Sequence, residues 1–263
     1  MVSRAHPQPI LSARGIVNRF GNHAVHDRID LDVLPGEIVG IVGGSGSGKS
    51  VLLKTLIGLR RPDRGEVRVN GTPVQRIDET SKAALFGVLF QQGALFSSLS
   101  VAQNVMLPMR HHTRLPIEQQ ERIAAMKIEL AGLPAESGIQ FPYQLSGGMV
   151  KRAAFARALA LDPQILFLDE PTSDLDPVTA SGIDALIRQL NRSLGVTVVI
   201  VTHDLTTLFT ICGRVAVLVD RKIVVGRIDK LLKSGHPWIH EFLHGPRGRG
   251  AKLSAKEQAN GNR

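Results

Sequence analysis

The sequence predicts an α/β domain with a largely parallel sheet and a helical lobe inserted into it. Two observations support this prediction. In the last third of the chain, strand-length apolar runs alternate with segments of helical spacing, the arrangement of parallel strands joined by helices. Between about residues 97 and 159, by contrast, helical spacing prevails.

Size and composition limit the possible classes of protein. The chain has 263 residues, of which 43% are apolar and 21% charged, so we expect one large domain or two lobes and not a disordered chain. Its only cysteine, Cys212, excludes an intrachain disulfide and a cysteine-based zinc site. The apolar runs are shorter than a membrane-spanning helix, and no signal peptide is predicted.

The net charge of +9 is unevenly distributed. Five basic residues and one acidic residue give residues 247–263 a charge of +4, which leaves +5 for the rest of the chain. A folded body this mildly basic predicts no nucleic-acid partner. We expect residues 8–245 to form the folded domain and residues 246–263 a flexible basic tail.

The first third of the chain is rich in strand patterns. Residues 38–42 predict a buried strand that runs into a glycine-rich loop, and residues 51–59 then have the apolar spacing of a helix. Residues 66–70 alternate in hydrophobicity and end in Asn70-Gly71, a typical two-residue hairpin turn.

The remaining elements follow from the same periodicities. A helix ends in the glycine that follows its last periodic residue, and a buried strand is a short apolar run. The predicted helices cover residues 118–130, 151–161 and 183–194, and the predicted strands cover residues 164–168 and 197–201.

The most specific motif is the glycine-rich loop between the first predicted strand and helix. It matches G-x-x-x-x-G-K-[ST], in which glycines let backbone N–H groups surround phosphates and the helix N-terminus adds the positive end of its dipole. Lys49 can then reach the β- and γ-phosphates of ATP, and Ser50 can hold Mg²⁺. The predicted nucleotide-binding residues here are Gly43, Gly44, Ser45, Gly46, Ser47, Gly48, Lys49, Ser50 and Val51.

An apolar strand that ends in two acids, Asp169 and Glu170, is the second motif. A carboxylate at Asp169 can hold the Mg²⁺ that bridges the β- and γ-phosphates, directly or through water. Glu170 can orient and polarise an attacking water. This pair favours hydrolysis over phosphoryl transfer, since no motif for a phosphate acceptor accompanies it.

The third motif, Leu-Ser-Gly-Gly-Met, opens a helix predicted to begin near Val150. A serine followed by two glycines at a helix start is a second anion-binding N-terminus. One nucleotide does not need two such cradles from one chain. We therefore expect Ser146, Gly147 and Gly148 to meet a nucleotide held by another copy.

Together these motifs resemble those of the ATP-binding-cassette (ABC) ATPases over nearly the whole chain. Leu-Ser-Gly-Gly-Met is similar to the LSGGQ signature of that family. Gln91 resembles the Q-loop glutamine, His203 the switch histidine and Phe20 the aromatic residue that stacks on adenine, and Asp174 lies in a segment similar to the D-loop. The resemblance implies a P-loop NTPase (RecA-like) core with an N-terminal antiparallel β subdomain and an inserted helical subdomain at about 97–159.

The resemblance also implies a mechanism. Two copies close head to tail around two ATP molecules, so that Ser146 and Gly148 of one copy contact the γ-phosphate held by Lys49 of the other. Hydrolysis then separates the copies and moves an integral-membrane permease docked near Gln91. The implied catalytic residues are Glu170, His203 and Lys49, and the implied Mg²⁺ ligands are Ser50, Gln91 and Asp169.

Two positions depart from the common family pattern. Met149 replaces the signature glutamine, and Asp174 replaces a small D-loop residue. Met149 and the residues after it are similar to the ATPases of Mla/Mce-type phospholipid transporters, also described as toluene-tolerance proteins. Residues 94–96, 112–116 and 236–238 share this similarity.

The narrower resemblance implies a specific function. The ATPase would power phospholipid movement between inner and outer membranes, which maintains outer-membrane lipid asymmetry. Its partners would be a permease, an Mce-type lipid-binding subunit and a small cytosolic accessory subunit, with the ATPase dimer at the cytoplasmic face of the inner membrane. Two alternatives are an importer-type ABC ATPase for another substrate, and a non-transport ABC ATPase that acts on nucleic acid or ribosomes.

Overall fold

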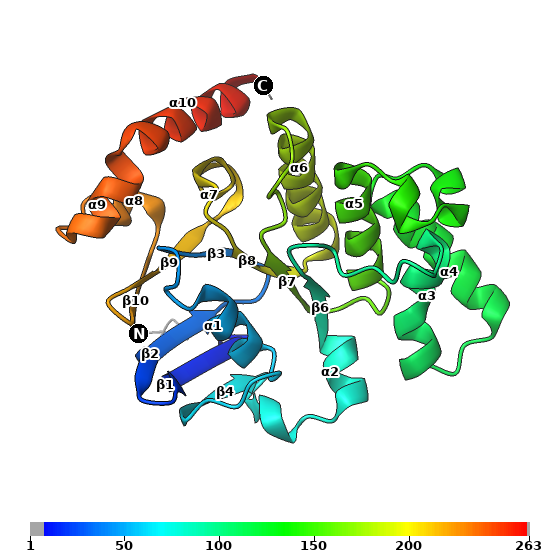
Figure 1. The fold of residues 1–263 in the computed structure, drawn as a ribbon, viewed down its shortest axis with the longest axis horizontal. Coiled ribbons are helices and arrows are strands. Elements are labelled where there is room, and N and C mark those ends of the chain that lie inside the picture. The colour runs from blue at the N-terminus through cyan, green and yellow to red at the C-terminus, as the bar shows by residue number, and fades with distance from the viewer. Residues whose placement is uncertain (1–7, 262–263) are drawn as a thin grey trace, which may run out of the picture.

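A six-stranded sheet runs through the middle of the computed structural model, which describes residues 8–261 (Figure 1). Its strand order is β10-β9-β3-β8-β7-β6. The strands from β9 to β6 pair in parallel, as the alternation of strands and helices predicts, and β10 pairs antiparallel with β9. The strands are β3 (Ile38–Gly43), β6 (Phe86–Leu89), β7 (Ile165–Asp169), β8 (Thr197–Val201), β9 (Arg214–Val219) and β10 (Lys222–Gly226).

A second, antiparallel sheet is formed by residues from the first third of the chain, in the order β2-β1-β4-β5. The predicted turn at Asn70-Gly71 joins β4 to β5. Both turn residues have positive φ, 49° and 78°, as a tight two-residue hairpin requires. The strands are β1 (Leu11–Phe20), β2 (His23–Val33), β4 (Arg64–Val69) and β5 (Thr72–Pro73).

Both faces of the parallel part of the central sheet are buried, as is usual for parallel strands, whereas the antiparallel edge strand β10 is partly exposed. In the view of Figure 1, α1 (Lys49–Leu56) and the antiparallel sheet lie below it, and α6 (Pro177–Leu194) and α7 (Leu205–Ile211) lie above it. Successive strand residues alternate between these two cores. Val199 and Val201 pack with α1 and the antiparallel sheet, whereas Val198 and Ile200 pack with α5 (Gly147–Ala158) and α6.

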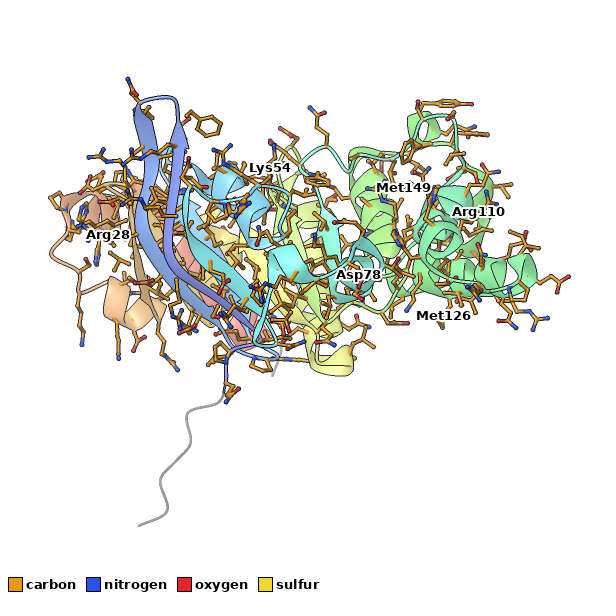
Figure 2. The ribbon with its side chains drawn as sticks, turned by 90° about the horizontal axis from the view of Figure 1, so that it is seen from below. Arg28, Lys54, Asp78, Arg110, Met126 and Met149 are labelled. Carbon is orange, nitrogen blue, oxygen red and sulfur yellow. The ribbon has the colours of Figure 1, made fainter. Side chains whose placement is uncertain are left out.

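The helical lobe consists of α3 (Val101–His112), α4 (Ile117–Leu130) and α5, which all fall between residues 97 and 159. Figure 2 shows Arg110, Met126 and Met149 in this lobe, at the opposite end of the molecule from Arg28. A capping box between Ser100 and Gln103 fixes the start of α3. The shorter helices before and within the lobe are α2 (Glu79–Leu85) and the 3-10 turns η1 (Val74–Arg76), η2 (Ala135–Ile139) and η3 (Pro142–Gln144).

The C-terminal part differs from the expected flexible tail. After α8 (Ile228–Leu231) and α9 (Pro237–His244), a helix, α10 (Pro246–Gly261), covers all of that predicted tail except residues 262–263, which lie outside the described residues. Proline is favoured in a first helical turn, and α10 packs against α7 through the buried Ala251. Tertiary packing therefore overrides the poor helix propensity of this glycine-rich segment.

Within residues 8–261, no helix is both long enough and apolar enough to cross a membrane.

Candidate functional site

The motif residues meet at one edge of the central sheet. β3, β8, β7 and β6 are parallel neighbours, so their carboxyl ends lie along the same edge. The loops that follow them carry Lys49, His203, Glu170 and Gln91. Ligands of open α/β sheets bind beyond the carboxyl ends of the strands, so this edge is the candidate site.

The glycine-rich loop between β3 and α1 is shaped for phosphate. A Cβ on Gly48, where φ is 92°, would lie 2.3 Å from Val25 Cγ1, so only glycine fits. Gly48 caps α1 without any side-chain hydrogen bond, which leaves N–H groups of the first turn free for an anion. The buried Ser47 Oγ has no hydrogen-bond partner among the described residues, as expected of a group placed for a ligand.

The side chain of Lys49 is hydrogen-bonded to the backbone of this loop. Its Nζ donates to the carbonyl oxygens of Gly43 at 2.9 Å and Gly44 at 3.1 Å. The helix begins at Lys49 and not at residue 51, because Gly48 adopts the left-handed conformation just before it. Ser50 is exposed in the first turn. The ammonium is thus held over the place where the loop leaves room for phosphate.

Asp169 at the end of β7 is suited to a cation. Burial, and then the neighbouring Glu170 carboxylate, raise the pKa of Asp169 above its ordinary value, while Lys49, Lys54 and Lys151 oppose this rise. A divalent cation bound here would stabilise the ionised form of Asp169 against the effects of burial and of the Glu170 charge. No cluster of three or more His, Cys, Asp or Glu side chains suited to a metal occurs in residues 8–261. A single carboxylate with a hydroxyl fits Mg²⁺, which nucleotide sites hold by one or two carboxylates together with phosphates.

Glu170 and His203 are in direct contact. Nδ1 of His203 lies 2.9 Å from the Glu170 carboxylate, and Thr202 Oγ1 lies 3.4 Å from it. An ionised carboxylate only accepts hydrogen bonds, so Nδ1 carries the proton and Nε2 is left for another partner. Glu170 is 9% exposed, whereas the His203 side chain is 67% exposed. The pair therefore extends from the protein interior to the solvent-exposed edge of the sheet.

Phe20 and Gln91 both have exposed side chains. Phe20 ends β1 and is 53% exposed, with the Arg60 guanidinium 4.2 Å from its ring centroid. Gln91 is exposed two residues after β6, and its backbone carbonyl accepts a hydrogen bond from Lys151 Nζ. The side chain of Gln91 therefore remains available to a ligand.

The signature residues lie apart from the glycine-rich loop of the same chain. Ser146 is the N-cap of α5 and accepts a hydrogen bond from the Met149 backbone N–H at 3.3 Å, so the helix begins at Gly147 and not near Val150. In Figure 2, Met149 lies in the helical lobe, away from Lys54 of α1. Ser146 and Gly147 are exposed, as residues that meet another molecule would be.

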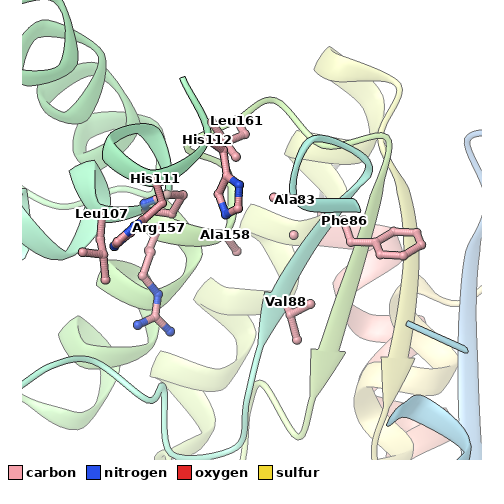
Figure 3. Close-up of a pocket in the computed structure, with 11 residues that line it drawn as sticks. Ala83, Phe86, Val88, Leu107, His111, His112, Arg157, Ala158 and Leu161 are labelled. Atoms are coloured by element: carbon pink, nitrogen blue, oxygen red, sulfur yellow. The ribbon is translucent and has the colours of Figure 1, made fainter. Parts of the chain in front are cut away.

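A cavity of about 340 Å³ separates β6 from the helical lobe. Figure 3 shows Val88 of β6 facing His111 and His112 of α3 and Arg157 of α5 across it. Arg157 donates to the carbonyl oxygens of Gly93 at 2.8 Å and Ala94 at 2.6 Å, so it also fixes the loop after Gln91. Arg157 therefore links the cavity to the loop that follows Gln91.

The family of this chain follows from its similarity to a model of known sequences. The model of the ABC transporter family matches residues 26–173, more than half of the chain. The chain belongs to the ABC transporter family. This ATP-binding cassette therefore binds and hydrolyses ATP, and cassettes of the family act as dimers together with membrane permeases.

Related proteins agree with this assignment. MlaF of Escherichia coli K12, an intermembrane phospholipid transport system ATP-binding protein, is 40% identical over 90% of this cassette and 89% of MlaF. The protein mkl of Mycobacterium leprae, a probable ribonucleotide transport ATP-binding protein, is 40% identical over 90% of this cassette and 69% of mkl. The solved dimer of the cassette MJ0796 with ADP and Pi is 31% identical, with a TM-score of 0.76 over 83% of this cassette and 98% of that chain. The predicted ABC-type fold is confirmed.

Sequence reasoning missed two residues of this cassette that contact the site. Lys151 contacts both Gln91 and Glu170, and the only hint was its position four residues before the buried Phe155 on α5. The ring of Trp238 stacks on Phe242, with ring centroids 4.8 Å apart. A Cβ on Gly44 would lie 3.7 Å from Trp238 Nε1, so the indole lies beside the glycine-rich loop.

Proposed function

We propose that this cassette powers phospholipid transport between the inner and outer membranes, and so maintains outer-membrane lipid asymmetry. The observation that supports the cargo is the similarity to MlaF along nearly the full length of both chains. The observation that supports the ATPase chemistry is the meeting of Lys49, Asp169, Glu170 and His203 at the carboxyl edge of three neighbouring parallel strands.

In this proposal the glycine-rich loop binds the phosphates of ATP. Backbone N–H groups of residues 43–48, the Ser47 hydroxyl and the N-terminus of α1 hold the phosphate oxygens, with Val51 in the first turn beside them. Lys49 moves its hydrogen bonds from the Gly43 and Gly44 carbonyls to the β- and γ-phosphates. The exposed face of Phe20 stacks on adenine, because the other face is covered by Arg60.

Mg²⁺ fits the oxygen atoms of Ser50, Gln91 and Asp169. When bound, the ion neutralises charge on the β- and γ-phosphates. Glu170 orients a water for attack on the γ-phosphate and accepts its proton. His203 keeps the Glu170 carboxylate in place through Nδ1–H and presents Nε2 towards the γ-phosphate.

A second copy completes the site. Ser146, Gly147 and Gly148 form a helix N-terminus that lies away from the glycine-rich loop of its own chain, with Ser146 and Gly147 exposed and Gly148 half-buried. In a head-to-tail dimer these residues contact the γ-phosphate bound by the other copy. ATP then holds the two copies together, and hydrolysis releases them.

The permease docks in the cavity between β6 and the helical lobe. Arg157 lines this cavity and donates hydrogen bonds to the loop after Gln91, so movement of the permease would be transmitted through Arg157 to the Mg²⁺ site. The cassette dimer lies at the cytoplasmic face of the inner membrane. We include an Mce-type lipid-binding subunit and a small cytosolic accessory subunit as further partners, and no nucleic acid.

The cargo is tested by purifying the tagged cassette from gently solubilised membranes and reconstituting the recovered complex in liposomes. We expect a multispanning permease and bound phospholipid to co-purify, and phospholipid to raise the ATPase rate. The similarity to mkl supplies a second candidate, so ribonucleotides are tested in parallel. Stimulation by ribonucleotide alone, or recovery of ribosomes without a permease, would discard phospholipid as the cargo.

A further inference from the structure

Lys151 is a buried lysine whose ammonium contacts three different motifs. The residue lies on α5 and is only 6% exposed. Its Nζ donates to the backbone carbonyls of Gln91 and Glu170, the latter at 3.0 Å, and to Ser173 Oγ at 3.3 Å. An ammonium has three N–H donors and no acceptor, so these three oxygens use its full hydrogen-bonding capacity.

The three oxygens belong to the core, whereas Lys151 belongs to the helical lobe. Gln91 follows β6, Glu170 follows β7, and Ser173 lies in the D-loop segment between β7 and α6. A charged group is buried at high cost unless it is hydrogen-bonded and paired. Asp174, Glu170 and Asp169 supply the negative charge that offsets burial of this ammonium, with Asp174 the largest contributor.

The backbone that Lys151 holds is strained. Glu170 has φ 50° and Asp174 has φ 62°, both in the left-handed region that non-glycine residues rarely adopt. Such residues persist only where the surroundings fix them, and they cluster at functional sites. Three groups donate to the Glu170 carbonyl: Lys151 Nζ at 3.0 Å, the Ser173 hydroxyl at 2.9 Å and the Ser173 backbone N–H at 3.3 Å. The side chain of the same residue contacts His203 Nδ1 at 2.9 Å.

We propose that Lys151 is a positioning residue for ATP hydrolysis, which holds the strained turn at Glu170 and conveys the position of the helical lobe to it. Movement of α5 relative to the sheet shifts the ammonium, and with it both Glu170 and the loop after Gln91. This inference rests on the role proposed above for Glu170.

The experiment compares two buried lysines of the helical lobe in the full transporter complex. Lys151→Met is the test and Lys127→Met the matched control, because Lys127 is 3% exposed on α4 and pairs with Asp162 at 2.5 Å, away from the site. We expect Lys151→Met to lower kcat about 10- to 100-fold with the KM for ATP within about threefold, since small misplacements of reacting groups have effects of this size. Lys127→Met should lower thermal stability with kcat within about twofold of the parent.

Further variants separate positioning from folding and from the role of Glu170. Lys151→Arg, which restores the charge and donors, should recover kcat at least partly, and it decides the matter if Lys151→Met does not fold. Wild-type kcat in Lys151→Met, or equal kcat losses in both methionine variants, would overturn the inference. Glu170→Gln is measured alongside. If Glu170→Gln keeps the wild-type kcat, the proposed role of Glu170 is wrong. If Glu170→Gln loses activity but Lys151→Met does not, only the positioning role of Lys151 is rejected.

Discussion

At the scale of single residues, His26 shows how the phosphate-binding loop is supported from below. The ring is fully buried in β2, and its Nδ1 accepts a hydrogen bond from Asn18 Nδ2 at 3.0 Å. Its Nε2 faces Gly48, where a Cβ would lie only 2.6 Å away. Burial lowers the pKa of His26 to about 4; the nearby Gly48 backbone opposes the shift, and the positive Arg60 adds to it. The ring is therefore neutral in the folded protein near pH 7.

Acidification should weaken the fold through this histidine. The pKa of His26 is lower in the folded than in the unfolded chain. The stability that the neutral ring contributes is therefore fully present above about pH 6.5 and is lost as the pH falls towards 4. Between pH 7 and 4.5, urea unfolding should show the parent losing about 2 kcal/mol more stability than His26→Leu. His23→Gln, an exposed neighbour in the same strand, should behave like the parent. Equal losses in parent and His26→Leu would contradict this.

At the scale of secondary-structure elements, a buried carboxyl joins α6 to α7. Asp184 contacts the Thr207 hydroxyl at 3.0 Å and 3.1 Å, and the same hydroxyl lies 3.1 Å from Asp204 Oδ2. One hydroxyl has one proton, so it cannot donate to both carboxylates, and a protonated Asp184 resolves the conflict. Burial raises the pKa of Asp184 to about 7; Thr207 opposes the rise, Asp204 adds to it and Arg188 opposes it.

Replacement of this carboxyl should change how stability depends on pH. When folding raises the pKa of a carboxyl, the protonated group adds to the free energy of unfolding. This addition is fully present below the unfolded pKa and is lost as the pH rises towards 7. Between pH 5 and 8, the stability of Asp184→Asn relative to the parent should therefore rise by about 3 kcal/mol. Urea unfolding at both pH values measures it, with the exposed Asp229→Asn as control. A stability difference independent of pH would refute the assignment.

At the scale of the whole molecule, the two halves of the proposed ATP site lie in different lobes. The glycine-rich loop belongs to the core, and the signature residues open α5 in the helical lobe. Each chain of a head-to-tail dimer therefore supplies one half of each site. A defect in either half would disable both sites of a homodimer, but only one site of a suitably mixed dimer.

Mixing two inactive variants should restore activity. In a mixed dimer of Lys49→Ala and Ser146→Ala, one site carries both defects and the other carries none. With random assortment, half of the dimers are mixed, so about a quarter of parental ATPase activity should return. Each variant alone, at the same total concentration, is the control. Failure to recover activity, with mixed dimers verified by two different tags, would show that the two residues serve the same site within one chain.

The sequence predicted the strands and motifs better than the contacts between lobes. The predicted strand at residues 197–201 agrees with β8, because a buried parallel strand is a continuous apolar run. Helix starts at Lys49 and Gly147 were placed two and about three residues late, because glycines that cap or open a helix have poor propensity. Lys151 was missed altogether, since its three acceptors lie far away along the chain and only folding brings them together.

The position of Trp238 beside Gly44 has a consequence for fluorescence. The chain contains a single tryptophan, and its indole lies beside the loop proposed to bind the phosphates of ATP. Indole emission responds to the polarity and motion of its surroundings, and no second tryptophan contributes to the signal. The unlabelled protein thus carries its own fluorescent reporter beside the proposed phosphate-binding loop, in the segment that joins the core to α10.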